Sequence, residues 1–562
     1  MKRKGTEIIL QALINEGVKT VFGYPGGCVI PLFDEFLNYD EIELVRVRHE
    51  QAATHAADGY ARVSGKASVV IATSGPGATN TITGIATAAM DSIPMVIITG
   101  QVRTAVIGTN AFQETNVVGV SRPVTKHNYL VKTVDSLPRI LKEAFHIAQT
   151  GRPGPVLVDI PVDLQTQFTE EPFPSEVKIP GYVLPPEIGT KDIQQAWEMI
   201  RHSYKPVLYV GGGAILADAA AELIKFVEKT NIPVVTTLLG LGAFPEGHEL
   251  SLGMLGMHGH YTANMSMTKT DLVLAIGARF DDRVTGKVES FLAQSKIIHV
   301  DVDASVINKI KEAHLGIVGD VKEFLQKLNQ VAEPLSLTPW LDELTTMQKE
   351  HPLPNYDQQE MEENCLRPEY VIRQFCQETD GKAVIVTDVG QHQMFVALHY
   401  QFKEARSHLS SGGLGTMGFS LPAAMGVAFY NQKRPIISFS GDGGFQMNIQ
   451  ELATVHDYNM PLIIVVLNNG NLGMVKQWQD LFWEGRHAST IFETSPDFVK
   501  IAEAYGIPAY RTGLKEEVPL LVKKALQHKG PILLEFMLEK DAMVYPMIPA
   551  GGELTDIIEG EG

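Results

Sequence analysis

The run Gly441-Asp442-Gly443-Gly444 constrains this chain more than any other feature of its sequence. A helical stretch follows it, then an apolar strand at 461–467, and then the pair Asn468-Asn469. One strand–helix–strand unit returns Asp442 and Asn469 to the same edge of a parallel sheet. Oxygen ligands at such an edge suit Mg²⁺, and the glycines and the helix N-terminus suit a diphosphate. The pattern predicts a magnesium–phosphate site, although an ordinary crossover turn also fits these residues.

The bulk composition excludes several classes of protein. With 562 residues the chain is too long for one hydrophobic core, so its length suggests three or four domains. Its formal net charge of -18 argues against nucleic-acid binding. No apolar run reaches membrane-spanning length, and the residues after the basic start do not form a signal-peptide core. Three cysteines without metal-ligand spacing fit a reducing compartment, so we expect a cytoplasmic protein that binds no membrane.

Alternating strand and helix patterns divide the chain into three α/β blocks, at 1–169, 188–335 and 367–538. The strands predicted in the first two blocks lie at 68–73, 95–99, 156–160, 206–210, 233–237, 272–277 and 297–302. Polar, proline-containing segments separate the blocks at 170–187 and 351–364, and a tail rich in Gly, Pro and Met follows at 539–562. We predict three doubly wound parallel-sheet domains. The first and third blocks resemble each other only faintly.

In the first block, Glu50 begins a helical stretch that continues to Arg62. Its carboxylate fits two roles: it favours the helix dipole by ~0.3–1 kcal/mol, or it serves a cofactor in proton transfer. The loop at 74–80 is a strand–turn–helix start that binds an anion or only makes the turn. Gln113 lies further along and is a candidate substrate-facing amide.

Two loops of the third block are candidate parts of the same site as Asp442. Gly390-Gln391-His392 follows a predicted strand at 383–388 and offers donors to phosphate oxygens, although His392 also fits an ordinary polar loop. A glycine-rich loop at 412–418 precedes an Ala-rich helix. In that loop Gly415 offers a carbonyl, and Met417 either fills the core or supports a ligand ring.

Glycine-rich loops of the second block indicate a nucleotide site. Gly211-Gly212-Gly213 follows the strand at 206–210, which alone fits either a dinucleotide loop or a plain turn. Loops at 256–259 and 277–283 end at the same sheet edge. The next strand is followed by Asp301-Val302-Asp303, where a carboxylate can bind ribose hydroxyls. Together these loops resemble an FAD site.

The order GDG, helix, strand and NN resembles the motif of thiamine diphosphate-dependent enzymes. Over nearly the whole chain the residues also resemble the catalytic subunits of acetohydroxyacid synthases, also called acetolactate synthases. The matching stretches lie at 23–27, 49–51, 108–114, 151–155, 279–283, 390–394, 473–478 and 544–549. Three positions depart from the family pattern: Cys28, Arg103 and Val162.

This resemblance implies a set of domains and cofactors. Residues 1–169 would bind the thiamine pyrimidine, 188–335 FAD, and 367–538 the diphosphate and Mg²⁺, while 539–562 would cover the active site. The metal ligands would be Asp442, Asn469 and the Asn471 carbonyl. The implied thiamine-binding residues are Gly26, Gly27, Gly390, Gln391, His392, Gly415, Met417, Gly441, Gly443, Gly444 and Met474. The implied FAD-binding residues are Arg152, Gly211, Gly212, Gly213, Met257, His258, Gly277, Arg279, Asp281, Asp301, Val302 and Asp320.

The resemblance also implies a reaction. The enzyme would decarboxylate pyruvate and transfer the two-carbon fragment to a second pyruvate or to 2-ketobutyrate, for valine, leucine and isoleucine biosynthesis. Glu50 would activate thiamine on the other subunit, and Gln113 would face the substrate. Arg283 would bind the second ketoacid's carboxylate, and Trp478 would shape its pocket. FAD would be structural. We expect a homodimer or homotetramer with active sites at the subunit interface, and a small regulatory subunit is a candidate partner.

Several alternatives fit part of the pattern. A pyruvate oxidase-like enzyme would use the same cofactors with a redox-active flavin, and Arg283 and Trp478 favour the synthase over it. A catabolic synthase of the butanediol type would lack Arg152 and the flavin loops. A catalytically inactive, nucleotide-binding paralogue is a rival from another class, and the presence of Glu50, Asp442 and Asn469 argues against it.

Overall fold

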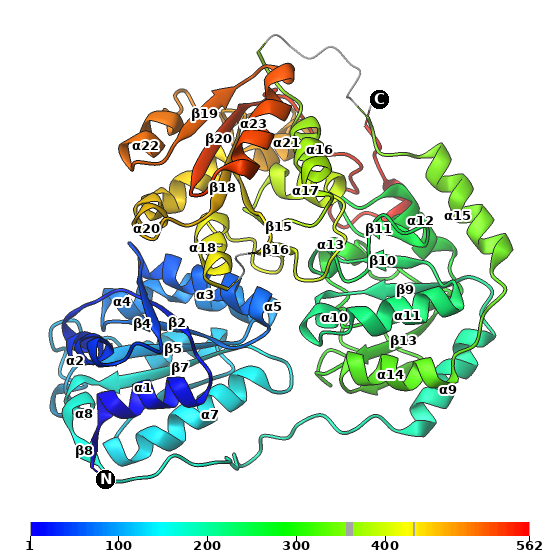
Figure 1. Cartoon of the computed structure of the whole chain (residues 1–562). Coiled ribbons are helices and arrows are strands. Elements are labelled where there is room, and N and C mark those ends of the chain that lie inside the picture. The colour runs from blue at the N-terminus through cyan, green and yellow to red at the C-terminus, as the bar shows by residue number, and fades with distance from the viewer. Residues whose placement is uncertain (1, 356–363, 431–432, 561–562) are drawn as a thin grey trace.

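The computed structural model describes residues 2–355, 364–430 and 433–560, and these form three α/β domains grouped around a common centre (Figure 1). Each domain is built on a six-stranded sheet, and every strand pairing in the three sheets is parallel, as the sequence predicted. Most of the polar segment predicted at 351–364 lies outside the described residues, as do Met1 and the last two residues of the predicted tail.

The first sheet has the strand order β3-β2-β4-β5-β7-β6. Its strands are β2 (Thr20–Gly23), β3 (Glu43–Arg46), β4 (Ser68–Ala72), β5 (Met95–Gln101), β6 (His127–Leu130) and β7 (Pro155–Pro161). Its helices are α1 (Gly5–Asn15), α2 (Ile30–Glu35), α3 (Glu50–Ser64), α4 (Pro76–Asn80), α5 (Ile82–Asp91), α6 (Val117–Ser121), α7 (Leu137–Gln149) and α8 (Val162–Thr166). Val69 and Ile71 of β4 pack into one core and Val70 into another. Both faces of the sheet are therefore buried, which explains the continuous apolar run of this strand.

A short antiparallel pair, β1 (Arg3–Lys4) and β8 (Phe168–Thr169), joins the two ends of this domain. The chain then runs without helix or strand to α9 (Thr190–Arg201) of the middle domain, along the lower edge of Figure 1.

The middle sheet has the order β11-β10-β9-β12-β13-β14. Its strands are β9 (Pro206–Val210), β10 (Val234–Thr236), β11 (Ser251–Met254), β12 (Leu272–Ile276), β13 (Lys296–Asp301) and β14 (Leu315–Val318). Its further helices are α10 (Gly212–Leu216), α11 (Ala220–Thr230), α12 (Tyr261–Lys269), α13 (Asp282–Thr285), α14 (Val321–Val331) and α15 (Thr338–Glu350). Counted within the domain, this is the Rossmann order, which reverses between β9 and β12.

The third sheet has the order β16-β15-β17-β18-β20-β19. Its strands are β15 (Val384–Thr387), β16 (His408–Ser410), β17 (Ile436–Gly441), β18 (Leu462–Asn468), β19 (Ala509–Thr512) and β20 (Ile532–Met537). Its helices are α16 (Pro368–Thr379), α17 (Gln391–His399), α18 (Ser420–Tyr430), α19 (Asp442–Phe445), α20 (Leu452–Asp457), α21 (Gly473–Phe482), α22 (Phe498–Ala504) and α23 (Val518–Gln527). Counted within its domain, each strand takes the same place as in the first sheet, so the two domains share one topology.

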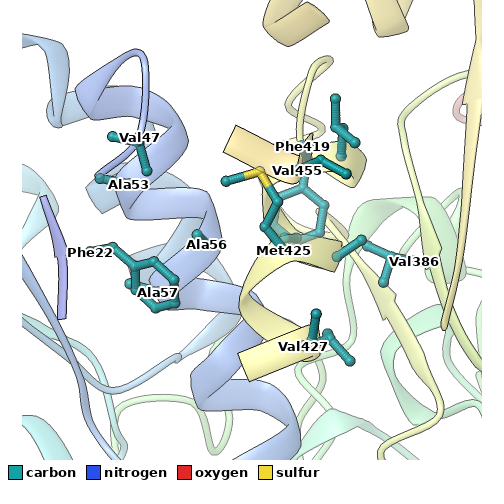
Figure 2. Close-up of a cluster of buried hydrophobic side chains, with 14 of the residues drawn as sticks. Phe22, Val47, Ala53, Ala56, Ala57, Val386, Phe419, Met425, Val427 and Val455 are labelled. Carbon is teal, nitrogen blue, oxygen red and sulfur yellow. The ribbon is translucent and has the colours of Figure 1, made fainter. Parts of the chain in front are cut away.

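Helices α3 and α18 hold the first and third domains together. Figure 2 shows α3, with Ala53, Ala56 and Ala57, lying against α18, with Met425 and Val427, in one buried cluster. Glycines bring the two backbones into contact: a Cβ on Gly426 would lie 1.8 Å from the Ala56 carbonyl oxygen. Small residues on both helices therefore set how closely the two domains pack.

Within the described residues, every helix is too short or too polar to cross a lipid bilayer.

Candidate active site

A cavity of about 670 Å³ lies where loops of the middle and third domains meet the end of α5. Loops that follow β9, β12 and β13 line it from the middle domain, and loops that follow β15, β17 and β18 line it from the third. Ligands of open α/β sheets bind at these carboxyl ends, so the cavity occupies the expected place in both domains.

Asp442, directly after β17, is the most unusual carboxylate of the cavity. Its side chain is buried, and neither oxygen accepts a hydrogen bond of ordinary length and angle from the described residues, although backbone amides lie near it. Burial raises the pKa of Asp442 to about 7, and backbone amides that include those of Gly443 and Gly470 offset part of this rise. A buried carboxylate without a partner is costly, and a cation beside it would remove that cost.

Two asparagines after β18 add neutral oxygens next to Asp442. The Asn469 Oδ1 accepts from the Asn471 backbone N–H at 3.2 Å, and its Nδ2 lies 3.4 Å from the Gln391 Oε1. The Asn471 Oδ1 is buried, and no described residue hydrogen-bonds to it. No group of three His, Cys, Asp or Glu side chains suited to a metal occurs among the described residues. One carboxylate with amide and backbone oxygens is nevertheless a ligand set that Mg²⁺ accepts, so the residues present fit this ion.

Glycines shape the floor of the cavity in the third domain. Gly390 has φ of +149°, a conformation that strains other residues. A Cβ on Gly441 would lie 3.1 Å from the His392 Nδ1, and one on Gly473 would lie 2.0 Å from the Gln391 Oε1. Burial lowers the pKa of His392 to about 4, so its imidazole is neutral, and its Nε2 has no partner among the described residues. These residues suit a diphosphate approached by backbone and neutral side chains.

Asp388 anchors the loop that carries Gly415 and Met417. Its carboxylate accepts from the Gly418 backbone N–H at 2.8 Å and from the Ser420 hydroxyl at 3.3 Å. Burial raises its pKa to about 6. From the sequence, Asp388 is predicted only as the last residue of the strand at 383–388, without this supporting role. Its position after β15, at the same edge as Asp442, is the signal that would have found it.

Glycines of the middle domain bring two of its loops into contact. A Cβ on Gly211 would lie 2.1 Å from the Gly277 carbonyl oxygen, and one on Gly277 would lie 2.6 Å from the Gly213 Cα. The loops after β9 and β12 can pass this closely only without side chains. They meet where the strand order reverses, which is where dinucleotides bind in this topology, so the residues fit FAD.

Polar groups from two domains surround that nucleotide crevice. The Arg152 Nε donates to the Ser92 hydroxyl at 2.8 Å, and its Nη1 lies 3.3 Å from the Asp303 carboxylate. Burial raises the pKa of Asp301 and lowers that of His258 to about 4, so the imidazole of His258 is neutral. The crevice thus offers a cation, neutral donors and a carboxylate to a ligand with phosphates and ribose.

Arg283 and Trp478 meet across the boundary between the middle and third domains. The Arg283 guanidinium carbon lies 5.7 Å from the centroid of the Trp478 ring, within cation–π range. More than half of the Arg283 side chain is exposed. The Trp478 Nε1 is buried without a partner among the described residues. The Arg283 Nε also lies 3.8 Å from the Asp282 carboxylate, so the pair presents a loosely paired guanidinium beside an aromatic wall.

The C-terminal tail ties the third domain to the middle domain beside this cavity. The Gln477 side chain exchanges two hydrogen bonds with the Val544 backbone, at 2.9 and 3.0 Å. Further along, the Ile548 backbone N–H donates to the Met257 carbonyl at 2.7 Å. Lys287 pairs with Glu553 at 2.7 Å. A smaller cavity of about 160 Å³ lies under this tail, next to Arg283.

The structure brings most of the predicted site residues to the large cavity. All predicted FAD-binding and metal-binding residues line it, together with Arg283 and Trp478. So do the predicted thiamine-binding residues of the third block: Gly390, Gln391, His392, Gly415, Met417, Gly441, Gly443, Gly444 and Met474. Four predicted residues do not line it: Gly26, Gly27, Glu50 and Gln113.

These four residues lie at the carboxyl edge of the first sheet. There the Glu50 Oε2 accepts from the Asn80 Nδ2 at 2.9 Å. A Cβ on Gly77 would lie 3.2 Å from the Glu50 Oε1, and one on Gly75 would lie 3.0 Å from the Gln113 Cβ. The three positions that depart from the family pattern, Cys28, Arg103 and Val162, follow β2, β5 and β7 at this edge. The first domain thus carries a second, separate group of predicted residues.

Comparison with family models matches all three domains. Residues 3–120 match the N-terminal TPP binding domain of thiamine pyrophosphate enzymes, 193–328 the central domain, and 388–536 the C-terminal TPP binding domain. Each range falls within one domain, although the first ends before β6 and β7 and the third begins after β15. The third range contains Asp442, Asn469 and Asn471.

Curated relatives are similar over all or nearly all of this chain. Acetolactate synthase 1, chloroplastic, of Nicotiana tabacum is 45% identical over all of this chain and 86% of its own length. Acetolactate synthase 2, chloroplastic, of Zea mays is 47% identical over all of this chain and 89% of its own. The acetolactate synthase large subunit of Buchnera aphidicola is 44% identical over 98% of both chains. Identities this high along the full length place the chain in the acetolactate synthase family of thiamine diphosphate-dependent enzymes.

Proposed function

We propose that this enzyme decarboxylates pyruvate and transfers the two-carbon fragment to a second pyruvate or to 2-ketobutyrate, for branched-chain amino-acid synthesis. The observation that carries this proposal is the single cavity that joins Asp442 and Asn469 to Arg283 and Trp478. The first pair suits a metal-bound diphosphate and the second suits a ketoacid. Both lie within one cavity, as a reaction between bound groups requires.

Mg²⁺ and thiamine diphosphate would occupy the half of the cavity built by the third domain. Asp442, the Asn469 side chain and the Asn471 carbonyl would hold the metal. The loops with Gly390 and Gly443 would hold the diphosphate, and the loop with Gly415 and Met417 would support the rings. Thiamine diphosphate would supply a nucleophilic carbon that adds to the carbonyl of a ketoacid and retains the two-carbon fragment when CO₂ leaves.

FAD would occupy the middle-domain half and serve as a structural group. Arg152 and the loops with Gly211 and Gly277 support this placement, because they form a dinucleotide crevice at the reversal of the strand order. The proposed transfer involves no net oxidation, so no electrons need pass through the flavin.

Arg283 would orient the acceptor ketoacid. Its guanidinium faces the cavity beside Trp478, and guanidinium forks bind carboxylates in two-point contacts. The first pyruvate is held through the cofactor, so the acceptor has the greater need of a charged contact. Trp478 would limit the space around the acceptor's alkyl group.

A second copy of the chain would complete the site. Glu50, Gln113, Gly26 and Gly27 lie at another edge of the molecule, where Phe112 next to Gln113 is 88% exposed. In a twofold dimer, the first-sheet edge of one copy would meet the third-sheet edge of the other. The Glu50 carboxylate would then stabilise the protonated aminopyrimidine of the partner's cofactor. We further propose a homodimer or homotetramer in the cytoplasm, with a small regulatory subunit as an additional candidate partner.

A product assay tests this proposal against the oxidase alternative. The purified chain is incubated with pyruvate, Mg²⁺ and thiamine diphosphate, with FAD or with a flavin analogue that cannot be reduced. We expect acetolactate under both conditions and no peroxide. Acetyl phosphate or peroxide in step with CO₂ release, lost with the analogue, would instead identify an oxidase.

A further inference from the structure

A buried ion network lies at the end of α5, outside the groups that would touch the substrates. Asp58 and Arg62 are one turn apart on α3, and Asp91 ends α5. The Arg62 guanidinium donates to the Asp58 carboxylate at 2.5 Å and to the Asp91 Oδ2 at 2.8 Å. All three residues are at most 8% exposed. Charges this deeply buried are costly unless they are well paired, so the network demands a structural or functional reason.

Asp91 also hydrogen-bonds to the third domain. Asp58, in contrast, pairs with Arg62 only, among the described residues. The Asp91 Oδ2 accepts from the Gly412 backbone N–H at 3.0 Å, and its Oδ1 accepts from the Gly413 N–H at 2.7 Å. A Cβ on Gly413 would lie 2.8 Å from the Asp91 Oδ1, so the loop comes this close because it has no side chain there.

The loop that Asp91 holds is the one that carries Gly415 and Met417. A second contact from the same helix supports it: the Thr87 and Thr416 hydroxyls lie 2.8 Å apart. On the other side, Asp388 holds the Gly418 backbone N–H. The segment 412–418 is therefore fixed at both ends by carboxylates, one from its own domain and one from the first domain.

We propose that Asp91, oriented by Arg62, is a positioning residue that holds the Gly412–Gly413 backbone so that Gly415 and Met417 are preformed for the thiamine rings. This inference rests on the proposed function, because that function assigns the loop to thiamine diphosphate. A preformed loop spares the ordering cost that binding would otherwise carry.

The test compares Asp91→Asn with Asp58→Asn in the full-length protein. Both changes remove one negative charge from the same buried guanidinium, and only the first also weakens the contacts to the loop. Binding of thiamine diphosphate with Mg²⁺ is measured by titration of intrinsic fluorescence. Amide hydrogen exchange of the segment 411–418 is measured in the cofactor-free protein.

We expect Asp91→Asn to raise the dissociation constant of thiamine diphosphate at least about tenfold more than Asp58→Asn does, because it weakens charge-assisted hydrogen bonds. Of these two variants, only Asp91→Asn should show faster amide hydrogen exchange in the segment 411–418. Gly413→Ala, which crowds Asp91 from the loop side and keeps all three side chains of the ion network, should reproduce both effects. It keeps the test valid if Asp91→Asn does not fold.

Equal binding and equal exchange in the Asp91 and Asp58 variants would overturn the positioning role. Failure of the proposed function gives a different result: the unaltered protein would then not bind thiamine diphosphate, while the exchange difference between the two variants would persist.

Discussion

The first and third domains share one strand order but carry different chemistry at the same edge. In each sheet the order turns back between the first and third strands of the domain, β2 and β4 in one and β15 and β17 in the other. The third domain places an unpaired carboxylate, Asp442, and glycine loops there. The first domain places Glu50, which is already hydrogen-bonded to Asn80, and small residues.

This difference indicates a division of labour between two copies of one topology. The third-domain edge has the oxygens and backbone donors that bind a metal and a diphosphate. At the first-domain edge Glu50 is instead held by Asn80 and lies close to Gly77. We infer that the third domain contributes most of the affinity for the cofactor and the first domain contributes its activation.

Glu50→Gln should give the largest effect, and it should fall on activation alone. Proton-transfer groups typically contribute ~10²–10⁴-fold in rate, so exchange of the thiamine C2 proton should slow by about that factor. The dissociation constant of the cofactor should change far less. NMR measurement of hydrogen–deuterium exchange on the bound cofactor provides the first value and a fluorescence titration the second. Unchanged exchange would remove Glu50 from the reaction.

Asp442→Asn should have the opposite effect, because it should mainly weaken binding of the cofactor. Loss of an outer-shell partner alone weakens metal sites by 10–100-fold, so removal of a direct charged ligand should weaken Mg²⁺-supported cofactor binding by at least about 100-fold. Activity should return in part at high Mg²⁺ and high cofactor concentration. Glu50→Gln is the matched control, since it also converts one carboxylate at the corresponding edge into an amide. Equal binding defects in the two variants would contradict the division.

Arg283→Ala should weaken the acceptor step and spare the first step. A charge-assisted contact contributes ~1.5–3 kcal/mol, which corresponds to about one to two decades in acceptor saturation. CO₂ release and acetolactate formation are measured side by side at increasing pyruvate. Should both fall equally, Arg283 contacts the flavin or the fold rather than the acceptor.

The affinity for Mg²⁺ should depend on pH, and this effect should be smaller than those of the three substitutions above. Burial raises the pKa of Asp442 to about 7 in the metal-free protein, so a proton competes with Mg²⁺ below that value. Affinity should fall by about tenfold per pH unit below pH 7 and level off above it. Without metal, the folded protein binds a proton at Asp442 more tightly than the unfolded chain does. The resulting contribution to the free energy of unfolding is lost as pH rises through about 7. Calorimetric titration across this range checks the slope, and Asp442→Asn should abolish it.

The sequence predicted those parts of the molecule that local patterns specify. The strand expected at 461–467 is β18 at Leu462–Asn468, and the unit between Asp442 and Asn469 returns both residues to one cavity. Strands that are buried on both faces can be predicted from sequence because they consist of a nearly continuous run of apolar residues. The edge strands β11 and β19 were not predicted, and neither were the interior strands β2 and β20.

Contacts between distant segments could not be predicted in this way. The glycine-rich loop at 412–418 is visible in the sequence, but its bonds to Asp91 and Asp388 are not, because no local pattern specifies which distant residue a loop will contact. The separation of Glu50 from the cavity also depends on how α3 packs against α18, and the sequence of one chain does not specify that arrangement.

Subunit complementation tests most directly whether the two edges come from two chains. Glu50→Gln and Asp442→Asn variants, each nearly inactive alone, are mixed, dissociated and reassociated. In a mixed dimer one site would carry both changes and the other would carry neither, so random pairing should restore about a quarter of the unaltered activity. If each chain completes its own site, every site in the mixture carries one defect, and activity would stay at the level of the separate variants.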